Sequence, residues 1–296
     1  MRFHVAPIRC GGSPREAAFD MGAVLAACAF TATLLLAGCS GMPATGAGEL
    51  IDQALAGPHR AKGNGERDVY RHPRDTLLFF GLRPDMTVVE IWPGGGWYTE
   101  VLAPVVRGRG LLYAAHFYVD KKSPPYMGTT RDNFRNKLAA SPAIYDQVQI
   151  TAFNAPDQLN IAPAGTVDMV LTFRNVHNWA AAKSDAAAFR TFYAALKPGG
   201  ILGVVEHRAK DGASLEEMIK SGYMTEAYVI ALAGKAGFKL VAKSEVNANP
   251  KDSRDHPRGV WTLPPTYRLG DQDRAKYAAI GESDRMTLKF VKPSNP

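Results

Sequence analysis

One short stretch of the chain, residues 87–100, constrains the fold more than any other. An apolar, β-branched run reaches Glu90 and Ile91, three glycines follow at Gly94-Gly95-Gly96, and apolar residues then recur at helical spacing. This order predicts a strand at residues 87–91, a tight turn and a helix. Because glycine has no Cβ atom, the turn leaves main-chain N–H groups open at the start of a helix, where polar and anionic ligands bind. The stretch therefore predicts an open parallel sheet with a ligand site at the carboxyl end of its first strand.

The rest of the chain continues this alternation of strands and helices. Apolar runs predict further strands at residues 111–115, 148–153, 167–173, 201–205, 238–246 and 286–291. Helical patterns lie at residues 49–56, 71–80, 129–138, 182–196 and 216–236. Alternation of this kind is typical of a parallel sheet covered on both faces. We therefore expect an α/β fold over residues 49–296: Rossmann-like and doubly wound, with a mostly parallel seven-stranded sheet, helices on both faces and an insertion at about residues 247–266.

The first 39 residues have the pattern of an export signal. Three arginines precede an uncharged, apolar run at residues 22–37, which is shorter than the roughly 20 residues of a membrane-spanning helix. The run ends in Leu36-Ala37-Gly38-Cys39, which resembles a bacterial lipobox. This resemblance implies cleavage before Cys39 and acylation of that cysteine, and Ser40 resembles the next residue of lipoproteins sorted to the outer membrane. An uncleaved anchor, or a start at Met21, is the alternative.

Composition supports export and limits the partners. All three cysteines lie within residues 1–39, so the folded domain has no thiol to mispair in an oxidising compartment. Residues 40–48 predict a flexible tether between the lipid and the domain. The net charge of +7 comes from lysines and arginines that are mixed with acids, with no basic run of the nucleic-acid type. We expect a domain anchored by lipid at the periplasmic side of a bacterial membrane, with a small-molecule substrate and no nucleic-acid partner.

Three motifs in order resemble the class I S-adenosylmethionine-dependent methyltransferases. They are Glu90-x-x-x-Gly94-x-Gly96 after a strand, the strand Val167-Asp168-Met169-Val170, and Leu196-Lys197-Pro198-Gly199-Gly200 before the next strand. Their order and spacing match over about residues 70–245. Residues 93–100, 173–179 and 249–265 are similar to a narrower group of proteobacterial proteins described as predicted methyltransferases. The resemblance implies S-adenosylmethionine as cofactor and methyl transfer to a small acceptor that the sequence does not identify.

The resemblance also implies roles for single residues. Glu90 would order the turn and orient the methionine end of the cofactor, the glycines would pass beneath it, and Asn154 would lie near the adenine. The expected cofactor contacts are Glu90, Trp92, Gly94, Gly95, Gly96, His116 and Asn154. On the acceptor side we expect Arg174, Asn175, His177, Glu206 and His207.

Two positions depart from the usual pattern. Trp92 stands where acid-x-Gly-x-Gly-x-Gly has its first glycine, and an indole there either blocks the site or stacks on the base. The acid that binds the ribose hydroxyls at the end of the second strand is replaced by Ala115, followed by His116. Both departures bear on the affinity for the cofactor rather than on the fold. The rival dinucleotide-binding turn, G-x-G-x-x-G, would need glycine at position 99, which is Thr99.

His177 and Arg174 are the candidate catalytic residues. An imidazole titrates near neutrality, so His177 is a candidate general base; alternatively it braces Trp179 or Asn175. Arg174 either clamps an anionic group of the substrate or pairs with Glu206, and we expect the ion pair.

The strand ends also raise the question of a metal. His116, His177, Glu206 and His207 each follow a predicted strand, so they could converge at one edge of the sheet. No short-range histidine spacing supports a metal site, and we expect none.

The insertion carries its own expectations. Trp261 and Leu263 indicate that it packs against the domain. Asp252, Asp255 and His256 are expected to be solvated turn residues, with a role in a lid as the alternative.

Two functions remain open at this point. The first is methyl transfer, in which the protein mainly aligns donor and nucleophile. The second is a non-catalytic or repurposed lipoprotein that keeps the crevice for another ligand or partner, because S-adenosylmethionine is a cytosolic metabolite. A metal-dependent periplasmic enzyme is a third and weaker hypothesis.

Overall fold

The computed structural model describes residues 46–294. The expected signal peptide, Cys39 and most of the expected tether lie outside these residues. The described chain begins with helix α1 (Ala47–Ala56), so helical structure starts two residues earlier than the sequence pattern predicts. No helix in the described part combines the length and the apolar character that crossing a membrane requires.

Seven strands form one sheet in the order β3-β2-β1-β4-β5-β8-β6. Strands β1 to β5 pair in parallel, whereas β8 runs antiparallel to both β5 and β6. The sheet is therefore a mixed seven-stranded one, and the expected α/β architecture is confirmed. The bounds are β1 Thr87–Ile91, β2 Leu111–Phe117, β3 Gln149–Phe153, β4 Val167–Phe173, β5 Leu196–His207, β6 Lys239–Ser244 and β8 Arg285–Val291.

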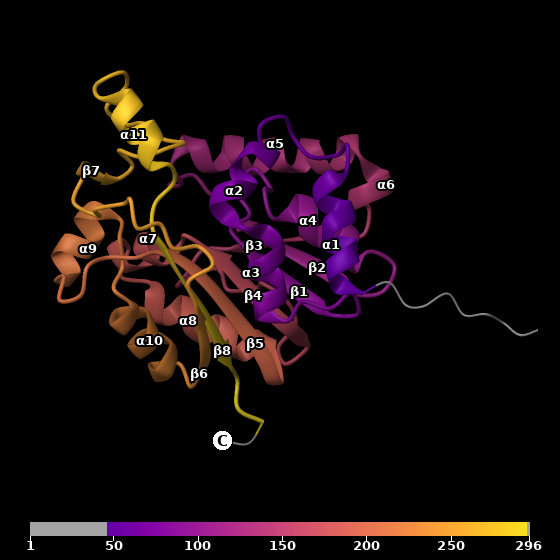
Figure 1. Cartoon of the computed structure of the whole chain (residues 1–296). Helices are drawn as coiled ribbons and strands as arrows, with labels where there is room; N and C mark the ends of the chain where they lie inside the picture. Colours follow the sequence, from indigo (N-terminus) through magenta and orange to yellow (C-terminus); the bar gives the residue numbers. More distant parts are fainter. Residues whose placement is uncertain (1–45, 295–296) are drawn as a thin grey trace, which may run out of the picture. The chain divides into compact units, whose positions relative to one another are not determined.

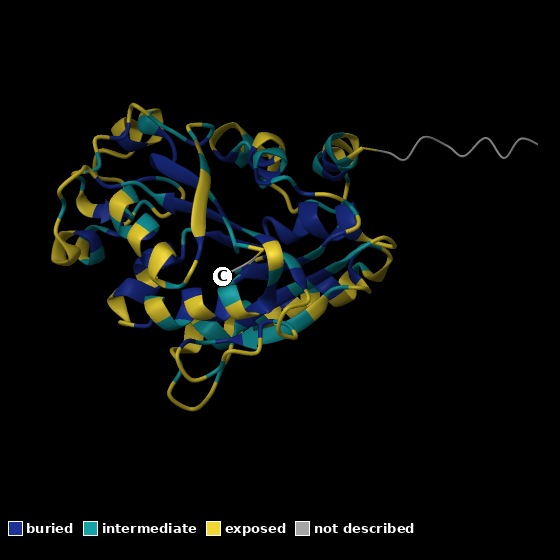
Figure 2. Cartoon of the chain, turned by 90° about the horizontal axis from the view of Figure 1, so that it is seen from below, coloured by how far each residue is buried: buried dark blue, intermediate teal, exposed yellow. Residues whose placement is uncertain are grey.

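Helices cover both faces of this sheet (Figure 1). Neighbouring residues of the buried strands point to opposite faces, so Val88 belongs to one hydrophobic core and Val89 to the other. This is why β1 and β4 are continuous apolar runs rather than alternating ones. Figure 2 shows the buried strands between outer helix surfaces that are exposed. One face carries α1, α3 (Pro73–Phe80), α4 (Thr99–Val106), α5 (Pro125–Ala140) and α6 (Pro142–Tyr145); the other carries α7 (Val176–Ala181), α8 (Asp185–Ala195), α9 (Leu215–Ser221) and α10 (Glu226–Lys235).

The helix predicted at residues 216–236 is two helices, α9 and α10. Gly222 ends α9 in the left-handed conformation, with φ of 74°, which stops the helix and turns the chain. The hydroxyl of Thr225 then accepts a hydrogen bond from the N–H of Tyr228 and caps α10. A new cap after a glycine stop explains the break, which apolar periodicity alone does not reveal.

The insertion is folded onto the domain. It contains the short strand β7 (Pro257–Val260), which lies outside the sheet, and it is followed by α11 (Arg274–Ile280). Leu263 is fully buried, as expected from its apolar character.

Asp252 and His256 correct the expectation of solvated turn residues. Asp252 is 1% exposed and accepts hydrogen bonds from the hydroxyl of Tyr223 at 2.9 Å and the N–H of Asp284 at 2.8 Å. His256 contacts the same carboxylate at 2.8 Å, and its side chain is 5% exposed. Only Asp255 is exposed as expected. The expectation failed because Tyr223 and Asp284 come from distant segments, and their hydrogen bonds to Asp252 hold the insertion against the start of β8.

Candidate active site

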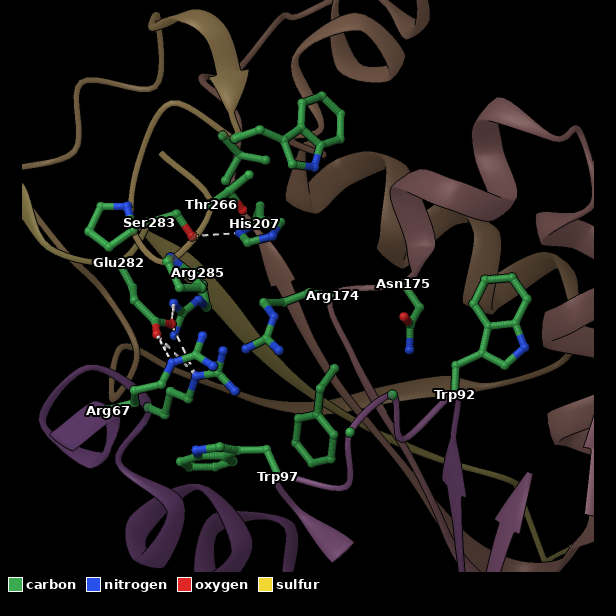
Figure 3. Close-up of a pocket in the computed structure, with 18 of the residues that line it drawn as sticks. Arg67, Trp92, Trp97, Arg174, Asn175, His207, Thr266, Glu282, Ser283 and Arg285 are labelled. Atoms are coloured by element: carbon green, nitrogen blue, oxygen red, sulfur yellow. Dashed lines mark hydrogen bonds and ion pairs between the residues drawn. The ribbon is translucent and has the colours of Figure 1, made fainter. Parts of the chain in front are cut away.

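A cavity of about 480 Å³ lies where the strand order reverses, beside the carboxyl ends of β1 and β4 (Figure 3). Ligands of open α/β sheets bind at this position, and the volume suits a small molecule. One wall is the turn after β1, a second is the segment after β4, and residues 260–266 of the insertion form a third. The predicted crevice is therefore present, and the insertion helps to enclose it.

The glycine turn presents bare main chain to this cavity. A Cβ atom at Gly94 or Gly95 would meet no other atom within 4 Å, so the space above both residues is open. At Gly96 a Cβ atom would approach the ring of Phe134 to 3.0 Å, so this glycine allows close packing instead. The carbonyl of Gly95 accepts a hydrogen bond from the Lys137 ammonium at 2.9 Å, which ties the turn to α5. The turn is therefore fixed to α5 on one side and open to the cavity on the other.

His116 and Glu90 lie behind the turn rather than in the cavity. His116 is fully buried; its Nε2 donates to the carbonyl of Gly94 at 3.0 Å, and its Nδ1 accepts from the N–H of Phe117 at 2.8 Å. Burial lowers the pKa of His116 to about 4, so the ring is neutral. Glu90 is 2% exposed and accepts a hydrogen bond from the Thr99 hydroxyl at 2.6 Å. Burial raises the pKa of Glu90 to about 7.

Asn154 also lies away from the cavity wall, in a turn whose main chain bonds Gln158. Three expected cofactor contacts, Glu90, His116 and Asn154, therefore do not line the cavity. In the structure, His116 is hydrogen-bonded to the glycine turn, and Glu90 to Thr99 at the start of the helix that follows it. Their roles toward a cofactor stay predictions.

Trp92 forms the aromatic end of the cavity together with Phe117. Its indole N–H donates to the carbonyl of Phe153 at 2.9 Å, and its ring packs at centroid distances of 5.0 Å from Phe117 and 5.3 Å from Trp179. The backbone at Trp92 has φ of 49°, a left-handed conformation that favours glycine. The backbone at position 92 therefore has a conformation that suits glycine, while the indole of Trp92 lines the cavity.

A carboxylate orients His177 at the start of α7. Glu206 is fully buried, and its Oε2 accepts from the N–H of Val176 at 2.6 Å. Its Oε1 accepts from the N–H of His207 at 2.8 Å and lies 3.1 Å from Nδ1 of His177. With Nδ1–H donated to Glu206, the lone pair of His177 is on Nε2, and His177 lines the cavity.

His177, Glu206 and His207 converge, as three of the four metal-capable residues were expected to do. Their potential ligand atoms lie within 4.8 Å of one another. The Glu206 oxygens already accept main-chain N–H donors, which favours an orienting role over metal ligation. His207 is bonded through Nδ1 to the hydroxyl of Ser283, and burial lowers the pKa of His207 well below its ordinary value.

The expected ion pair between Arg174 and Glu206 is wrong. Glu206 is engaged by the start of α7, and Arg174 has φ of 62°, which turns the chain sharply after β4. Figure 3 shows the Arg174 guanidinium directed toward the opposite side of the cavity, where Arg67, Glu282 and Arg285 lie. Asn175, the next residue, donates to the carbonyl of Ile91 at 3.0 Å and joins the ends of β4 and β1.

A group of charged residues forms the polar end of the cavity, and sequence reasoning singled out only Arg174 among them. We call it the arginine cluster: Arg67, Arg71, Arg174, Arg285 and the acid Glu282. Nε of Arg67 donates to Glu282 at 2.6 Å, Nε of Arg71 donates to it at 3.0 Å, and Arg285 pairs with it as well. Burial alone raises the pKa of Glu282, but the surrounding guanidinium groups, led by Arg285, lower it to about 2.

For the other four members of the cluster, the only sequence signal was local. Glu282 and Arg285 are separated by two residues at the entrance to the last apolar strand, where a buried charge needs a partner. Arg67 and Arg71 lie about 215 residues earlier in the chain, so nothing in the sequence joins them to that pair.

Comparisons with known proteins identify the fold and no closer relationship. No family model matches the sequence, and no curated protein matches it. Among solved structures, the [4+2]-cyclase SpnF is similar with a TM-score of 0.51 and 16% identity, over 82% of this chain and 91% of that chain. A proposed sarcosine dimethylglycine methyltransferase from Galdieria sulphuraria is similar with a TM-score of 0.51 and 12% identity, over 78% of this chain and 86% of that chain. An arsenic(III) S-adenosylmethionine methyltransferase from Chlamydomonas reinhardtii is similar with a TM-score of 0.50 and 14% identity, over 83% of this chain and 74% of that chain. The chain has the class I methyltransferase fold.

Proposed function

We propose that this chain is an S-adenosylmethionine-dependent methyltransferase that acts on a small acceptor in the cavity above the glycine turn. One observation carries the proposal: the open main chain at Gly94 and Gly95 shares one cavity with His177, whose ring is oriented by a buried carboxylate. A donor on the turn and an acceptor beside the histidine would meet there. Two of the solved neighbours named above are described as methyltransferases, which supports the proposal at the level of fold.

The residues of the cavity fit this cofactor in part. Gly94 and Gly95 leave room for it above the main chain, and the aromatic end formed by Trp92 and Phe117 would face its base. The acid that usually holds the ribose is absent from the end of β2, where Ala115 is buried, and Asp120 beyond the strand does not line the cavity. When bound, the cofactor supplies an activated methyl group on a sulfonium.

His177 would act as the general base. Because Nδ1 of His177 donates its hydrogen bond to Glu206, Nε2 is free to take a proton from the acceptor atom that receives the methyl group. The hydrogen bonds that the N–H groups of Val176 and His207 donate to Glu206 fix the carboxylate, so the imidazole is held in one orientation. General base catalysis of this kind contributes roughly 10²–10⁴-fold to the rate.

A second candidate function is a repurposed fold that binds a different ligand. The indole of Trp92 in the cavity wall favours it, because the family pattern has glycine there, and so does Ala115 in place of the ribose-binding acid. The neighbour SpnF is described as a [4+2]-cyclase, so a protein of this fold can carry another chemistry.

Titration calorimetry of S-adenosylmethionine into the full chain and its Trp92→Gly variant tests both candidates. Glycine adopts φ of 49° readily, so the substitution removes the indole without straining the turn. The methyltransferase proposal expects micromolar binding to the wild type, weakened in the variant if the indole stacks on the base. A flat trace for the wild type at millimolar ligand contradicts it, and binding gained only by Trp92→Gly supports the repurposed fold.

We also propose that the protein is exported and anchored through acylated Cys39 at the periplasmic side of the outer membrane. The lipobox pattern and the confinement of cysteine to the first 39 residues support this location. Labelled palmitate should enter the wild type and a Cys28→Ala control but not Cys39→Ala. Labelling that persists in Cys39→Ala would contradict the anchor.

A further inference from the structure

We propose that the arginine cluster is an anion-binding subsite, and that the acceptor carries a carboxylate or phosphate group that docks on it. The acceptor part of this inference rests on the proposed function, because it places the acceptor in the same cavity. The subsite itself requires only the geometry of the cavity wall.

The first argument is the balance of charge. The cavity wall contains four arginines and one glutamate as its permanently charged side chains, which leaves three positive charges without a counterion. Glu282 is already shared by Arg67, Arg71 and Arg285. Buried charges in proteins are normally paired, so an excess of this size inside a cavity indicates that a negative group belongs there.

The second argument is that donors are left open. Across residues 46–294, no hydrogen bond or ion pair involves the Arg174 guanidinium, although it lines the cavity. Nε of Arg285 is buried and also has no partner among the described residues. A guanidinium presents its N–H groups in a planar fork that matches the two oxygens of a carboxylate or phosphate. An anion beside Arg174 would satisfy donors that this part of the chain leaves unsatisfied.

The third argument is that the charges disfavour one another without such a ligand. Burial, followed by the charge of Arg174, lowers the pKa of Arg71 well below its ordinary value. Burial and the charge of Arg285 lower the pKa of Arg174 to about 10. The charged forms are therefore costly beside one another, and a bound anion would remove much of that cost.

A purely structural role explains only part of the cluster. Glu282 joins the segment before β8 to the early helices through Arg67 and Arg71, whose guanidinium also lies 4.7 Å from the Trp97 ring centroid. That link does not require Arg174, whose guanidinium adds one of the three positive charges in excess. Arg174 is the residue whose placement a structural link leaves unexplained.

Titration calorimetry of inorganic phosphate and of succinate into the full chain tests the subsite. We expect saturable binding that Arg174→Gln weakens about tenfold or more. Among the described residues, this variant breaks no hydrogen bond or ion pair, and glutamine tolerates φ of 62° as well as arginine does. Arg83→Gln is the matched control, because Arg83 is an exposed arginine whose one ion-pair partner within residues 46–294 is Asp85. Arg67→Gln, at a partly exposed position, provides a second test, with thermal unfolding as the check on folding.

The outcomes separate the subsite from the proposed function. Absence of saturable binding, or equal losses in Arg174→Gln and Arg83→Gln, overturns the subsite. If S-adenosylhomocysteine binds and displaces phosphate, the cluster holds the carboxylate of the cofactor, and the inference of an acidic acceptor is overturned. If phosphate and S-adenosylhomocysteine bind together, the acidic acceptor is supported. If phosphate binds and neither S-adenosyl compound does, the subsite stands and the methyltransferase proposal fails.

Discussion

Replacing Glu90 by glutamine should change how the stability of the fold depends on pH. Glu90 is 2% exposed, and burial raises its pKa from 4.5 to about 7. Below about pH 4.5 the carboxyl is protonated in both the folded and the unfolded chain. As the pH rises toward 7, the unfolded chain loses this proton first, so the free energy of unfolding falls. Above about pH 7 both forms are ionised and the loss is complete.

The size of this loss follows from the two pKa values. A pKa of about 7 in the fold and 4.5 in the unfolded chain corresponds to about 3 kcal/mol, at about 1.4 kcal/mol for each pKa unit. Glutamine has the same size and can accept the hydrogen bond from Thr99 without carrying a charge. Between about pH 4 and pH 8, Glu90→Gln should therefore gain about 3 kcal/mol of stability relative to the wild type.

The comparison must be a difference between proteins, because His116 acts in the opposite direction. Its pKa is lowered to about 4, so the unfolded chain binds the proton more tightly, and stability rises between about pH 4 and 6.5. The wild-type curve alone mixes the two effects. Both proteins contain His116, so its contribution cancels in the difference.

Urea unfolding followed by tryptophan fluorescence at a series of pH values would measure the effect. The matched control is Glu216→Gln, at an exposed position in α9, which should follow the wild-type curve within about 0.5 kcal/mol. A difference between Glu90→Gln and the wild type that stays constant from about pH 4 to pH 8 would refute the reasoning.

Four other substitutions follow from contacts described above. His116→Asn should lower the acid midpoint of unfolding, measured by circular dichroism, because it removes a buried group that must become protonated for the fold to open; an unchanged midpoint would contradict this. Gly95→Ala should leave the melting temperature unchanged but weaken ligand binding, whereas Gly94→Ala, at φ of 58°, should also lose about 1 kcal/mol of stability, and equal melting temperatures would argue against the left-handed turn. Asp252→Asn should lose about 2 kcal/mol in urea unfolding, because three buried partners share that carboxylate, and a loss below about 0.5 kcal/mol would count against the network.

The sheet could be predicted from the sequence because its signals are local. Strands β1 and β4 have the predicted bounds, since continuous apolar runs flanked by turns mark buried strands without reference to any partner. The direction of β8 could not be predicted in the same way. An apolar run reads the same for a parallel and an antiparallel strand, so only the pairing with β5 and β6 decides it.

The site could be predicted in part. His177, Glu206 and His207 converge because they lie at or just beyond the carboxyl ends of the adjacent strands β4 and β5, which is a consequence of topology alone. His116 also lies near the carboxyl end of a strand, β2, but its side chain packs against the glycine turn and Phe134, so its position in sequence did not place it in the cavity. The arginine cluster required tertiary contacts between the two ends of the described chain, and no local pattern contains that information.

The position of β8 has a consequence for the order of assembly. It is the last strand in sequence, yet it lies between β5 and β6, and β6 pairs with no other strand of the described sheet. During folding, β6 therefore has no edge to join until residues 285–291 arrive, and Arg285 reaches the cavity in the same event. Such distant pairings close slowly. Ligand binding in the cavity should therefore begin only after β8 has paired with β5 and β6. Binding of a ligand would then indicate that the sheet is complete.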